Sequence, residues 1–592
     1  FEKASQMFEK VKDLKLFQRI GIGYSNFCDI RQNNYFYVDK TEFIGDWWKN
    51  GTLATLITRP RRFGKSMTMS MVKYFFSTEY ANVKEDLFKG TKIWNDEIMM
   101  EIQGTYPVIS MNFGRYKSQD VNSILNSIKQ EIADATISFR QVLLQNADKL
   151  NEDEINFIKS INYEMNDDIA FKAIYKICML FARIYNKKLI ILLDEYDSPM
   201  IKFWVNRDDA GWEKLITFLK RFFCSTFKEN DFLQRALITG ITRICKESIF
   251  SGFNNLQVIT TSSYSYSTIF GFTYDEVQES LDDYGLNFWE DQIKQWYDGY
   301  CFGSTTQIFN PWSITKFLYE LKEPDCYWLN TSDNSLIEDL IRKCSPSLSS
   351  PLIDLLQNHE IYISMQEDIL FNDIYSRELE AIISLFVASG YISIIGKVKR
   401  DNISFSILKI PNFEIQQIFK KIITTWFEKS NSYSDFINSF IQCDLESLNK
   451  TLNQILLDCI GTFDSVECFS HGLCLGMLIE LRDRFDILSN RQSGKGRPNI
   501  IFIPKDTTKD NKGYIIEFKY QNKQQNCKKE TKTVLLELVQ DALQQIEEKH
   551  YDQDIIKRGI EQNNIVKYAM VFYDLECLVA IQGINYDAIN DN

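Results

Sequence analysis

The most constraining feature of the sequence is a pair of short apolar runs that each end in charged or hydroxyl residues. The run TLATLIT, residues 52–58, precedes the loop RPRRFGKS and the helical stretch MTMSMVKYFFS. A second run, KKLIILLDEYDSP, residues 187–199, ends in acidic residues. Short apolar runs that alternate with helical stretches are typical of a parallel sheet with helices on both faces. The sequence therefore predicts an α/β fold here, and runs at 106–113 and 235–244 add further strands.

Changes of pattern divide the 592 residues into four predicted domains of an α/β multidomain protein. A parallel-sheet domain with an N-terminal extension, which contains the loop RPRRFGKS, covers 1–270, and a helical lid with aromatic-rich turns covers 271–345. Residues 346–440 contain a helix followed by two strand-like runs, which predicts a winged helix, although any helix–hairpin unit gives the same pattern. Residues 441–592 read as helix, hairpin and helix, which predicts a compact α/β domain similar to restriction nucleases.

The loop RPRRFGKS is a partial match to the phosphate-binding pattern GxxxxGK[ST]. In that pattern backbone N–H groups hold the phosphates, Lys reaches the β- and γ-phosphates, and the hydroxyl residue binds Mg²⁺. Gly64, Lys65 and Ser66 are present, whereas Arg59 stands where the first Gly is expected. Taken alone the loop is equally well an ordinary basic loop. The preceding strand, the following helix and the second acidic strand favour a site for ATP and Mg²⁺.

The acidic pair Asp194–Glu195 supplies the second half of this predicted site. Asp194, with Ser66, would hold the metal and its water shell, and Glu195 would orient the attacking water. Hydrolysis also needs positive charge at the transition state. Arg243 is one candidate for that charge, with a surface or interdomain ion pair as its alternative. Arg61 and Arg62 are competing candidates for the same charge, and Thr239 or Thr242 would sense the γ-phosphate. The predicted nucleotide-binding residues are Arg61, Arg62, Phe63, Gly64, Lys65, Ser66, Met67 and Thr239.

Near the C-terminus, the strand-like run KGYIIEFKY carries Glu517 and Lys519 at the spacing E-x-K. Residues two apart on a strand point to the same face, so both side chains can reach one metal and one substrate. A metal-dependent nuclease needs converging carboxylates and a Lys near the attacking water. Alternating charge on a strand is also common on solvated faces. The run SGKGRPNIIF before it and the helix after it favour the nuclease-like fold.

Composition limits the kinds of partner that the chain can bind. With a net charge of −13, the chain cannot coat nucleic acid over its whole surface, so a DNA contact would be confined to a local patch. Thirteen Cys without CxxC pairs indicate reduced thiols in a cytoplasmic or nuclear compartment. We expect no membrane partner, because no apolar run approaches the roughly 18 residues of a membrane span. Nothing in the sequence sets the oligomeric state, and oligomerisation stays open.

Several motifs together resemble a known family. The chain is similar to the bacterial and eukaryotic AAA-ATPase-like family, in which a P-loop domain is joined to a C-terminal domain of the PD-(D/E)XK nuclease superfamily. The resemblance implies an ATP-binding module of the ASCE type carrying Lys65, Ser66, Asp194 and Glu195, and it makes the departure at Arg59 acceptable. The motifs that carry it are YVDKT (37–41), TRPRRFGKS (58–66), LLDEYDSP (192–199), TGITRICKESIFSGFNNL (239–256), WYDGYCFG (296–303) and FNPWSI (309–314).

The resemblance also places Asn499 where the nuclease family has a metal-binding Asp. The predicted metal ligands there are Asn499 and Glu517, with Glu480 and Gln545 as accessory positions. A neutral amide is a poorer ligand for a hard dication than a carboxylate. Three readings follow: natural loss of cleavage with retained DNA binding, an engineered change, or a migrated ligand such as Asp506.

The leading hypothesis is an ATP-driven, DNA-directed protein whose P-loop domain hydrolyses ATP and whose nuclease-like domain engages DNA, with cleavage in doubt. The alternative is a signalling or scaffold ATPase in which nucleotide controls assembly and the terminal domain is structural or binds a partner. DNA-stimulated hydrolysis would support the first hypothesis. Nucleotide-dependent oligomerisation without DNA binding would support the second.

Overall fold

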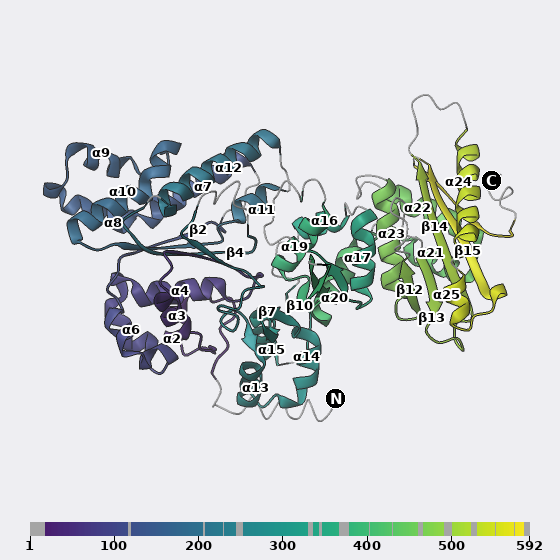
Figure 1. The fold of residues 1–592 in the computed structure, drawn as a ribbon, viewed down its shortest axis with the longest axis horizontal. Helices are drawn as coiled ribbons and strands as arrows, with labels where there is room; N and C mark the ends of the chain where they lie inside the picture. Colours follow the sequence, from purple (N-terminus) through teal and green to yellow (C-terminus); the bar gives the residue numbers. More distant parts are fainter. Residues whose placement is uncertain are drawn as a thin grey trace. The chain divides into compact units, whose positions relative to one another are not determined.

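The computed structural model describes residues 18–584, apart from 116–119, 205–207, 229, 244–252, 322, 329–334, 343–345, 366–373, 375–377, 402, 429, 460–465, 490–499, 522–529, 551 and 574. The chain forms two compact units (Figure 1). Unit 1 comprises Phe1–Leu336 and Ile363–Glu414, and unit 2 comprises Ile337–Tyr362 and Ile415–Asn592. The predicted winged-helix region, 346–440, therefore contributes to both units.

Unit 1 is built on a five-stranded sheet in which every neighbouring pair of strands is parallel. Its order is β2-β3-β4-β1-β5. The strand that leads into the P-loop, β1, is thus separated by β4 from the strand that carries the acidic pair, β3. The parallel sheet predicted for the ATPase is confirmed. The strands are β1 (Ala54–Thr58), β2 (Val108–Asn112), β3 (Leu189–Asp194), β4 (Leu233–Gly240) and β5 (Leu256–Ile259).

Helices cover both faces of this sheet (Figure 1). Every residue of β1 and β3 is buried, which is why these strands read as continuous apolar runs. Their side chains share a core with α4, the helix that follows the P-loop. One face carries α2 (Phe27–Gln32), α3 (Glu42–Asn50), α4 (Lys65–Phe76), α5 (Lys84–Phe88) and α6 (Glu97–Ile102), and the other α7 (Val121–Ala135), α8 (Ile137–Gln145), α9 (Glu152–Ser160), α10 (Asp167–Tyr185), α11 (Ser198–Trp204) and α12 (Asp209–Phe223).

The predicted helical lid, 271–345, contains a small sheet as well as helices. Its strands pair antiparallel in the order β6-β8-β7. Part of the segment WYDGYCFG forms the strand β7, which pairs with β8, and its Tyr300 and Phe302 pack on Phe63 of the P-loop. The elements are β6 (Phe272–Thr273), α13 (Tyr274–Asp283), α14 (Glu290–Tyr297), β7 (Tyr300–Phe302), β8 (Thr305–Phe309), α15 (Pro311–Glu320) and α16 (Ser335–Arg342).

The predicted helix and hairpin follow. The helix α19 (Leu379–Ser389) ends at Gly390, whose φ of 86° is left-handed, and the chain turns into the hairpin. Strands β10 (Ser393–Arg400) and β11 (Ile403–Lys409) pair antiparallel. The helix–hairpin order is confirmed, whereas its assignment as a winged helix stays a prediction. The neighbouring elements are α17 (Pro346–Leu356), β9 (Ile361–Ile363) and α20 (Phe413–Thr425).

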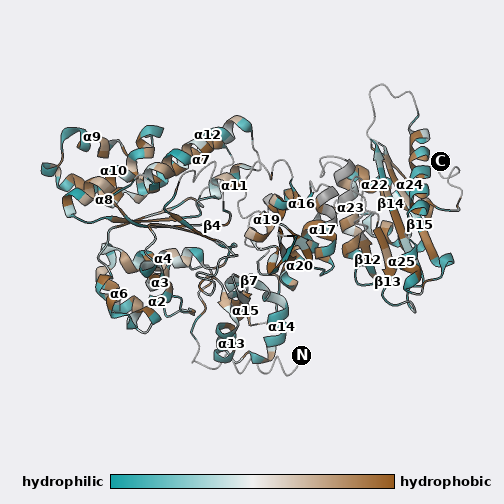
Figure 2. Ribbon diagram, viewed as in Figure 1, coloured by the Kyte–Doolittle hydropathy of each residue, from teal (hydrophilic) through white to brown (hydrophobic). Residues whose placement is uncertain are grey.

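Unit 2 contains a second five-stranded sheet, in the order β12-β13-β14-β15-β16. Only the pair β14–β15 is parallel among the described strands of this sheet. Figure 2 shows hydrophobic residues along these strands. The expected helix–hairpin–helix is present, and β15 and β16 extend it. The elements are α21 (Tyr433–Gln442), α22 (Leu445–Cys459), α23 (Val466–Leu481), β12 (Phe485–Ser489), β13 (Ile500–Pro504), β14 (Gly513–Gln521), α24 (Thr531–Glu548), α25 (Gln553–Lys557), β15 (Ile565–Tyr573) and β16 (Glu576–Ile581).

Candidate functional site

The P-loop connects the end of β1 to the N-terminus of α4. Gly64 is the N-cap of α4 and adopts a φ of 82°, a left-handed conformation that glycine takes without a steric penalty. Lys65 is buried, and its Nζ donates to the carbonyl oxygens of Arg59 at 2.9 Å and Pro60 at 2.8 Å. Burial lowers the pKa of Lys65, although Asp194 raises it in part. The loop thus directs a helix N-terminus and an ammonium group to one place, as phosphate binding requires.

Asp194 is the centre of a hydrogen-bond network at the end of β3. Its Oδ2 accepts from the Ser66 hydroxyl at 2.6 Å, and its Oδ1 accepts from the Thr239 hydroxyl and from the backbone N–H of Glu195 at 3.0 Å. A hydroxyl beside a carboxylate is the oxygen donor set that Mg²⁺ prefers. Ser66 and Asp194 therefore fit the predicted magnesium site. Thr239 is fully buried, and its hydrogen bond to Oδ1 helps to orient the Asp194 carboxylate.

Glu195 occupies a strained backbone position next to this network. Its φ is 53°, which is uncommon for a residue other than glycine. A Cβ atom added to Gly114 would lie 1.7 Å from Glu195 Oε2, so the glycine leaves room for the carboxylate. Burial, and then the neighbouring charge of Asp194, raise the pKa of Glu195. A half-buried carboxyl group with a raised pKa at the wall of a pocket is suited to a general base.

Lys65, Ser66 and Glu195 line a pocket of about 580 Å³ in unit 1, whereas Asp194 and Thr239 lie behind its described lining. The predicted residues Arg61, Arg62, Phe63, Gly64, Lys65, Ser66, Met67 and Glu195 all line it. The opposite wall comes from 21–25 and 36–38, near the start of the described chain. Sequence reasoning missed the segment 21–25 as part of the site. Its GIG pattern was the available signal, because glycines often mark a close approach of backbone to a ligand.

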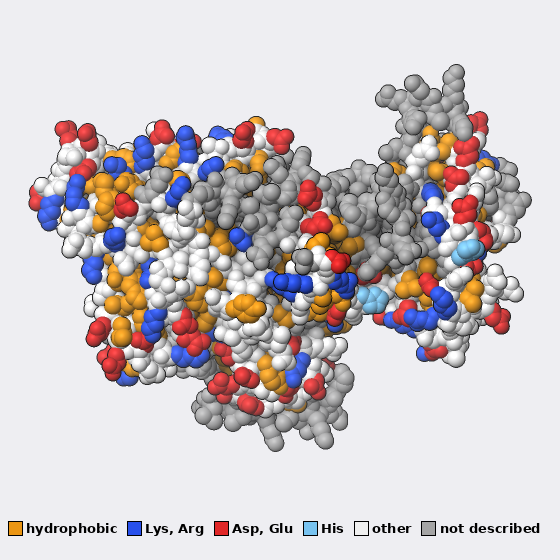
Figure 3. All heavy atoms as spheres, viewed as in Figure 1, with side chains coloured by type: hydrophobic (Ala, Val, Ile, Leu, Met, Phe, Trp, Pro, Cys, Tyr) orange, Lys and Arg blue, Asp and Glu red, His pale blue; other side chains and the backbone are white. Residues whose placement is uncertain are grey.

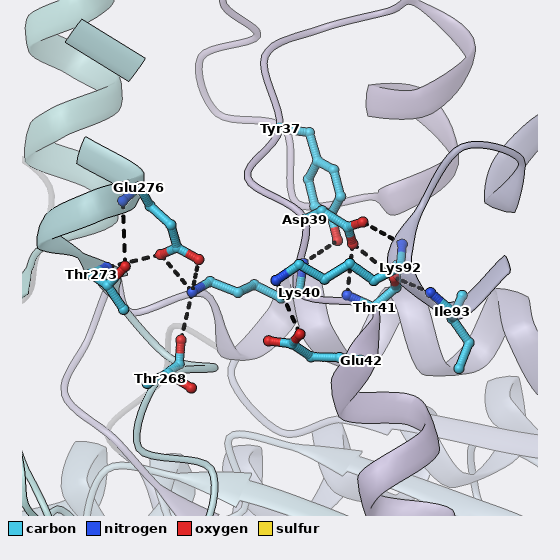
Figure 4. Close-up of polar contacts among 10 residues, drawn as sticks. All are labelled: Tyr37, Asp39, Lys40, Thr41, Glu42, Lys92, Ile93, Thr268, Thr273 and Glu276. Carbon is cyan, nitrogen blue, oxygen red and sulfur yellow. Dashed lines mark hydrogen bonds and ion pairs between the residues drawn. The ribbon is translucent and has the colours of Figure 1, made fainter. Parts of the chain in front are cut away.

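The pocket wall is tied to the lid by a nearly buried ion pair (Figure 4). Lys40 lines the pocket, and its Nζ lies 2.6 Å from Glu276 Oε1 and 2.5 Å from the carbonyl oxygen of Thr268. Glu276 is also the N3 residue of the capping box that starts α13. On the other side, Asp39 accepts from the backbone N–H of Thr41 at 2.9 Å. The motif YVDKT therefore joins the pocket wall to the lid.

Arg59 and Arg62 have different surroundings. Arg59 is fully buried, its guanidinium lies over the rings of Phe270 and Phe302, and it donates to the Thr58 carbonyl oxygen at 2.9 Å. It therefore anchors the loop to the lid instead of facing the pocket. Arg62 is exposed and lies over the ring of Trp312, 4.4 Å from its centroid. Aromatic faces attract such cations.

For two further residues the structure differs from the sequence prediction. Arg243 does not line the pocket at the P-loop among the described residues; it lines a second, smaller cavity in unit 1. Asp197, which sequence reasoning did not select, is buried and accepts from the backbone N–H groups of Ile241 at 2.9 Å and Thr242 at 2.7 Å. Asp197 thus fixes the loop after β4. The pattern D-E-x-D, with its third acidic residue, was the only signal for it.

In unit 2, Glu517 and Lys519 lie on the same face of β14 as predicted. Glu517 is 1% exposed, and the Lys519 Nζ lies 3.7 Å from Glu517 Oε1 and also donates to Gln545 Oε1 on α24. Glu480, at the end of α23, is exposed. Asn499 lies outside the described residues. Its neighbour Ile500 pairs with Ile516, so the start of β13 adjoins Glu517.

Asp506 is not a migrated ligand. It lies past the opposite end of β13 from Ile500, and its carboxylate accepts from the backbone N–H of Thr508 at 3.0 Å. The described residues contain no group of three or more His, Cys, Asp or Glu side chains that could hold a metal ion. Of the two predicted nuclease ligands, Asn499 and Glu517, the described residues include Glu517.

Comparisons with known proteins match one family model to a segment of each unit. Residues 21–250 match the family model described as a predicted AAA-ATPase, and residues 465–581 match that of the PD-(D/E)XK nuclease superfamily. An uncharacterised protein from the vnfD 5′ region of Azotobacter chroococcum is 25% identical over 407 residues, covering 67% of this chain and 68% of that protein.

Among solved structures, a Walker-type ATPase of Pyrococcus abyssi is 13% identical with a TM-score of 0.33, and the match covers 69% of this chain and 99% of that one. No helix in the described part of the chain has the length and apolar character needed to cross a membrane. The chain joins a predicted AAA-ATPase domain at residues 21–250 to a PD-(D/E)XK nuclease-superfamily domain at residues 465–581.

Proposed function

We propose that unit 1 binds ATP with Mg²⁺ and hydrolyses it. The observation that carries the proposal is the hydrogen bond from Ser66 to Asp194, which joins the end of the P-loop to the end of β3 beside Lys65 and Glu195. Mg²⁺, when bound, neutralises charge on the β- and γ-phosphates. The oxygens of Ser66 and Asp194 would hold the ion and its water shell.

The chain's own residues divide the work of hydrolysis. Lys65 would exchange its hydrogen bonds to loop carbonyls for the phosphate oxygens, because both are acceptors and the phosphates carry charge. Glu195 would orient the attacking water and accept its proton. Arg61 and Arg62, at the pocket, are better placed than Arg243 to stabilise the transferred phosphoryl group.

The first experiment compares nucleotide binding and phosphate release in three forms of the full chain: unchanged, Lys65→Ala and Lys73→Ala. Lys73 lies on the same helix and faces Tyr80 outside the pocket, so it is a matched control. We expect Lys65→Ala to weaken ATP binding by about tenfold or more, because a charge-assisted hydrogen bond contributes about 1.5–3 kcal/mol. Hydrolysis should be lost, also on removal of Mg²⁺. Turnover by Lys65→Ala at the unchanged rate would contradict the proposal.

We propose further that unit 2 engages DNA without cutting it efficiently. The support is Glu517, a buried carboxylate beside Lys519 on β14, together with the amide residue Asn499, which directly precedes β13 in the sequence. A fluorescence-anisotropy titration with labelled double- and single-stranded oligonucleotides tests binding. ATP hydrolysis with and without the same DNA then tests whether the two units are coupled.

A second function is favoured by the Lys40–Glu276 ion pair, which links the pocket wall to the lid. In this alternative, nucleotide moves the lid and so controls assembly or partner binding. The reducing cytoplasmic or nuclear location that we propose suits both functions. Sedimentation of the chain with and without nucleotide separates them. Nucleotide-dependent oligomers, with no DNA binding and no stimulation of hydrolysis, would favour the scaffold.

A further inference from the structure

Unit 1 contains a second cavity, of about 160 Å³, away from the P-loop pocket. One wall is formed by Thr58, the last residue of β1, and by the loop 260–262 that follows β5. The other wall is formed by α19 and by the β10–β11 hairpin. In open α/β sheets ligands bind outside the carboxyl ends of the strands, which is where this cavity begins.

The described lining of this cavity contains hydroxyl groups and cations but no carboxylate. Seven of the lining residues are Ser or Thr, two are the cations Arg243 and Lys397, and none of the described lining residues is acidic. The chain as a whole carries a net charge of −13, so a cavity with cations and no carboxylate departs from its average surface. Hydroxyl and ammonium groups both donate hydrogen bonds. Such a lining is suited to a ligand that accepts many hydrogen bonds and carries negative charge.

The hairpin fixes the direction of its donors. Lys397 on β10 pairs directly with Ser406 on β11. Side chains opposite each other in an antiparallel pair project from the same face, and Ser404, two residues from Ser406, shares that face. Ser406 is buried, as are Thr58 and Ser384 on the facing walls. Hydroxyl side chains from three elements therefore line one volume. The Thr58 hydroxyl also donates to the Ile259 carbonyl oxygen at 3.4 Å, and the Ser384 hydroxyl to the Met365 sulfur at 3.9 Å.

We propose that this cavity binds a phosphate group. Its volume is several times the roughly 30 Å³ that a water molecule occupies in the liquid, so it has room for a tetrahedral oxyanion. Free inorganic phosphate and a phosphate of a polynucleotide backbone share this chemistry. Figure 3 shows Lys and Arg side chains on the face where Figure 1 labels β10, the strand that carries Lys397. This site is independent of the proposed ATP site.

The test is isothermal titration of the full chain with inorganic phosphate. The P-loop could bind the same ion, so each titration is repeated in the Lys65→Ala chain, where binding that persists belongs elsewhere. We expect Lys397→Gln to weaken phosphate binding about tenfold, because one charge-assisted hydrogen bond is lost. Lys399→Gln is the matched control. It removes the same charge from the same face of β10, and Lys399 does not line the cavity.

Ser406→Ala provides a second variant, because it removes one buried donor without adding volume. It should weaken binding by a smaller factor and leave the melting temperature within about 2 °C. A second titration uses a labelled single-stranded oligonucleotide in place of phosphate. If only the oligonucleotide binds and the loss follows Lys397 but not Lys399, the phosphate comes from a polynucleotide. If neither ligand binds, or if the variants at 397 and 399 behave alike with both, the proposal is overturned.

Discussion

At the scale of single residues, the site depends on side chains that are buried and charged at the same time. Glu195 keeps its place because residue 114 is a glycine and because its own backbone adopts a left-handed φ of 53°. Strain of this kind, about 1–3 kcal/mol per residue, persists where surrounding structure enforces it and clusters at functional sites. Here the enforcing contacts are the hydrogen bonds that end at Asp194.

Glu195 gives a prediction about pH. A general base acts only as the carboxylate, and burial raises the pKa of Glu195, so hydrolysis should increase with pH through a value above the ordinary Glu pKa of about 4.3. Glu195→Gln cannot accept the proton and should lower turnover by about 10²-fold or more while ATP binding stays within a few-fold. Phosphate-release rates and nucleotide titrations between pH 5.5 and 8.5 measure both effects.

The control for this experiment is Glu213→Gln, which neutralises an exposed carboxylate on α12. Its pH profile should match that of the unchanged chain. Equal turnover by Glu195→Gln and the unchanged chain would remove Glu195 from the chemistry and direct attention to Asp194 or Asp197.

At the scale of elements, the sequence predicted what is local. The strand, loop and helix around Lys65 are encoded within a short continuous stretch of the chain, so periodicity and glycine position suffice to identify them. The role of Arg59 is not local, because its guanidinium lies on Phe270 and Phe302, more than 200 residues further along the chain. The same reason explains the lid, where the strand β7 forms against Phe63 of the P-loop.

Glu414 joins elements of the lid region in unit 1 and gives a second pH prediction. It is fully buried, and its carboxylate accepts from the Ser313 hydroxyl at 2.8 Å and from the Trp328 backbone N–H at 2.9 Å. Burial raises its pKa to about 7. The folded chain therefore holds this proton at pH values where the unfolded chain has released it. Its contribution to stability is complete below about pH 4.5 and is lost as the pH rises through 7.

Between pH 6 and pH 8 this effect should lower the free energy of unfolding by about 1 kcal/mol. Glu414→Gln resembles the protonated side chain and does not titrate, so its melting temperature should exceed that of the unchanged chain at pH 8 and approach it at pH 6. Scanning calorimetry at both pH values measures the difference. Glu323→Gln, an exposed site, is the control. A constant difference between the Glu414→Gln variant and the unchanged chain across this range would mean that Glu414 does not change its protonation state there, which would contradict the prediction.

At the scale of the whole molecule, two sites lie in separate compact units. The order of the ATPase-like and nuclease-like segments was predictable, because each is marked by a motif within a short continuous stretch of sequence. The strands β15 and β16 were not predicted, although β15 is the parallel neighbour of the strand that carries Glu517. Parallel pairing joins segments that are far apart in sequence, so no local turn pattern predicts it. The division of 346–440 between the units was hidden for the same reason.

The nuclease-like domain supports the last prediction, on Asn499→Asp. Ile500 pairs with Ile516, the residue before Glu517. The substitution would therefore add a carboxylate directly before Ile500 in the sequence. Two carboxylates hold a divalent cation much better than a carboxylate and an amide. We therefore expect Asn499→Asp to cut DNA with Mg²⁺ or Mn²⁺, where the unchanged chain cuts little or none. Agarose gels of supercoiled plasmid and labelled single strands measure the gain.

Two matched variants make this result specific. Asn563→Asp adds the same charge at an exposed position of unit 2 and should give no cleavage. Adding Glu517→Gln to Asn499→Asp should abolish the gain, because the metal again has one carboxylate. If Asn499→Asp binds DNA but does not cut it, the missing carboxylate alone does not silence the site. Repeating the assay with ATP, and in the Lys65→Ala background, then measures coupling between the units. If cleavage requires Lys65, ATP at unit 1 controls unit 2. If cleavage is unchanged without Lys65, the two units act independently.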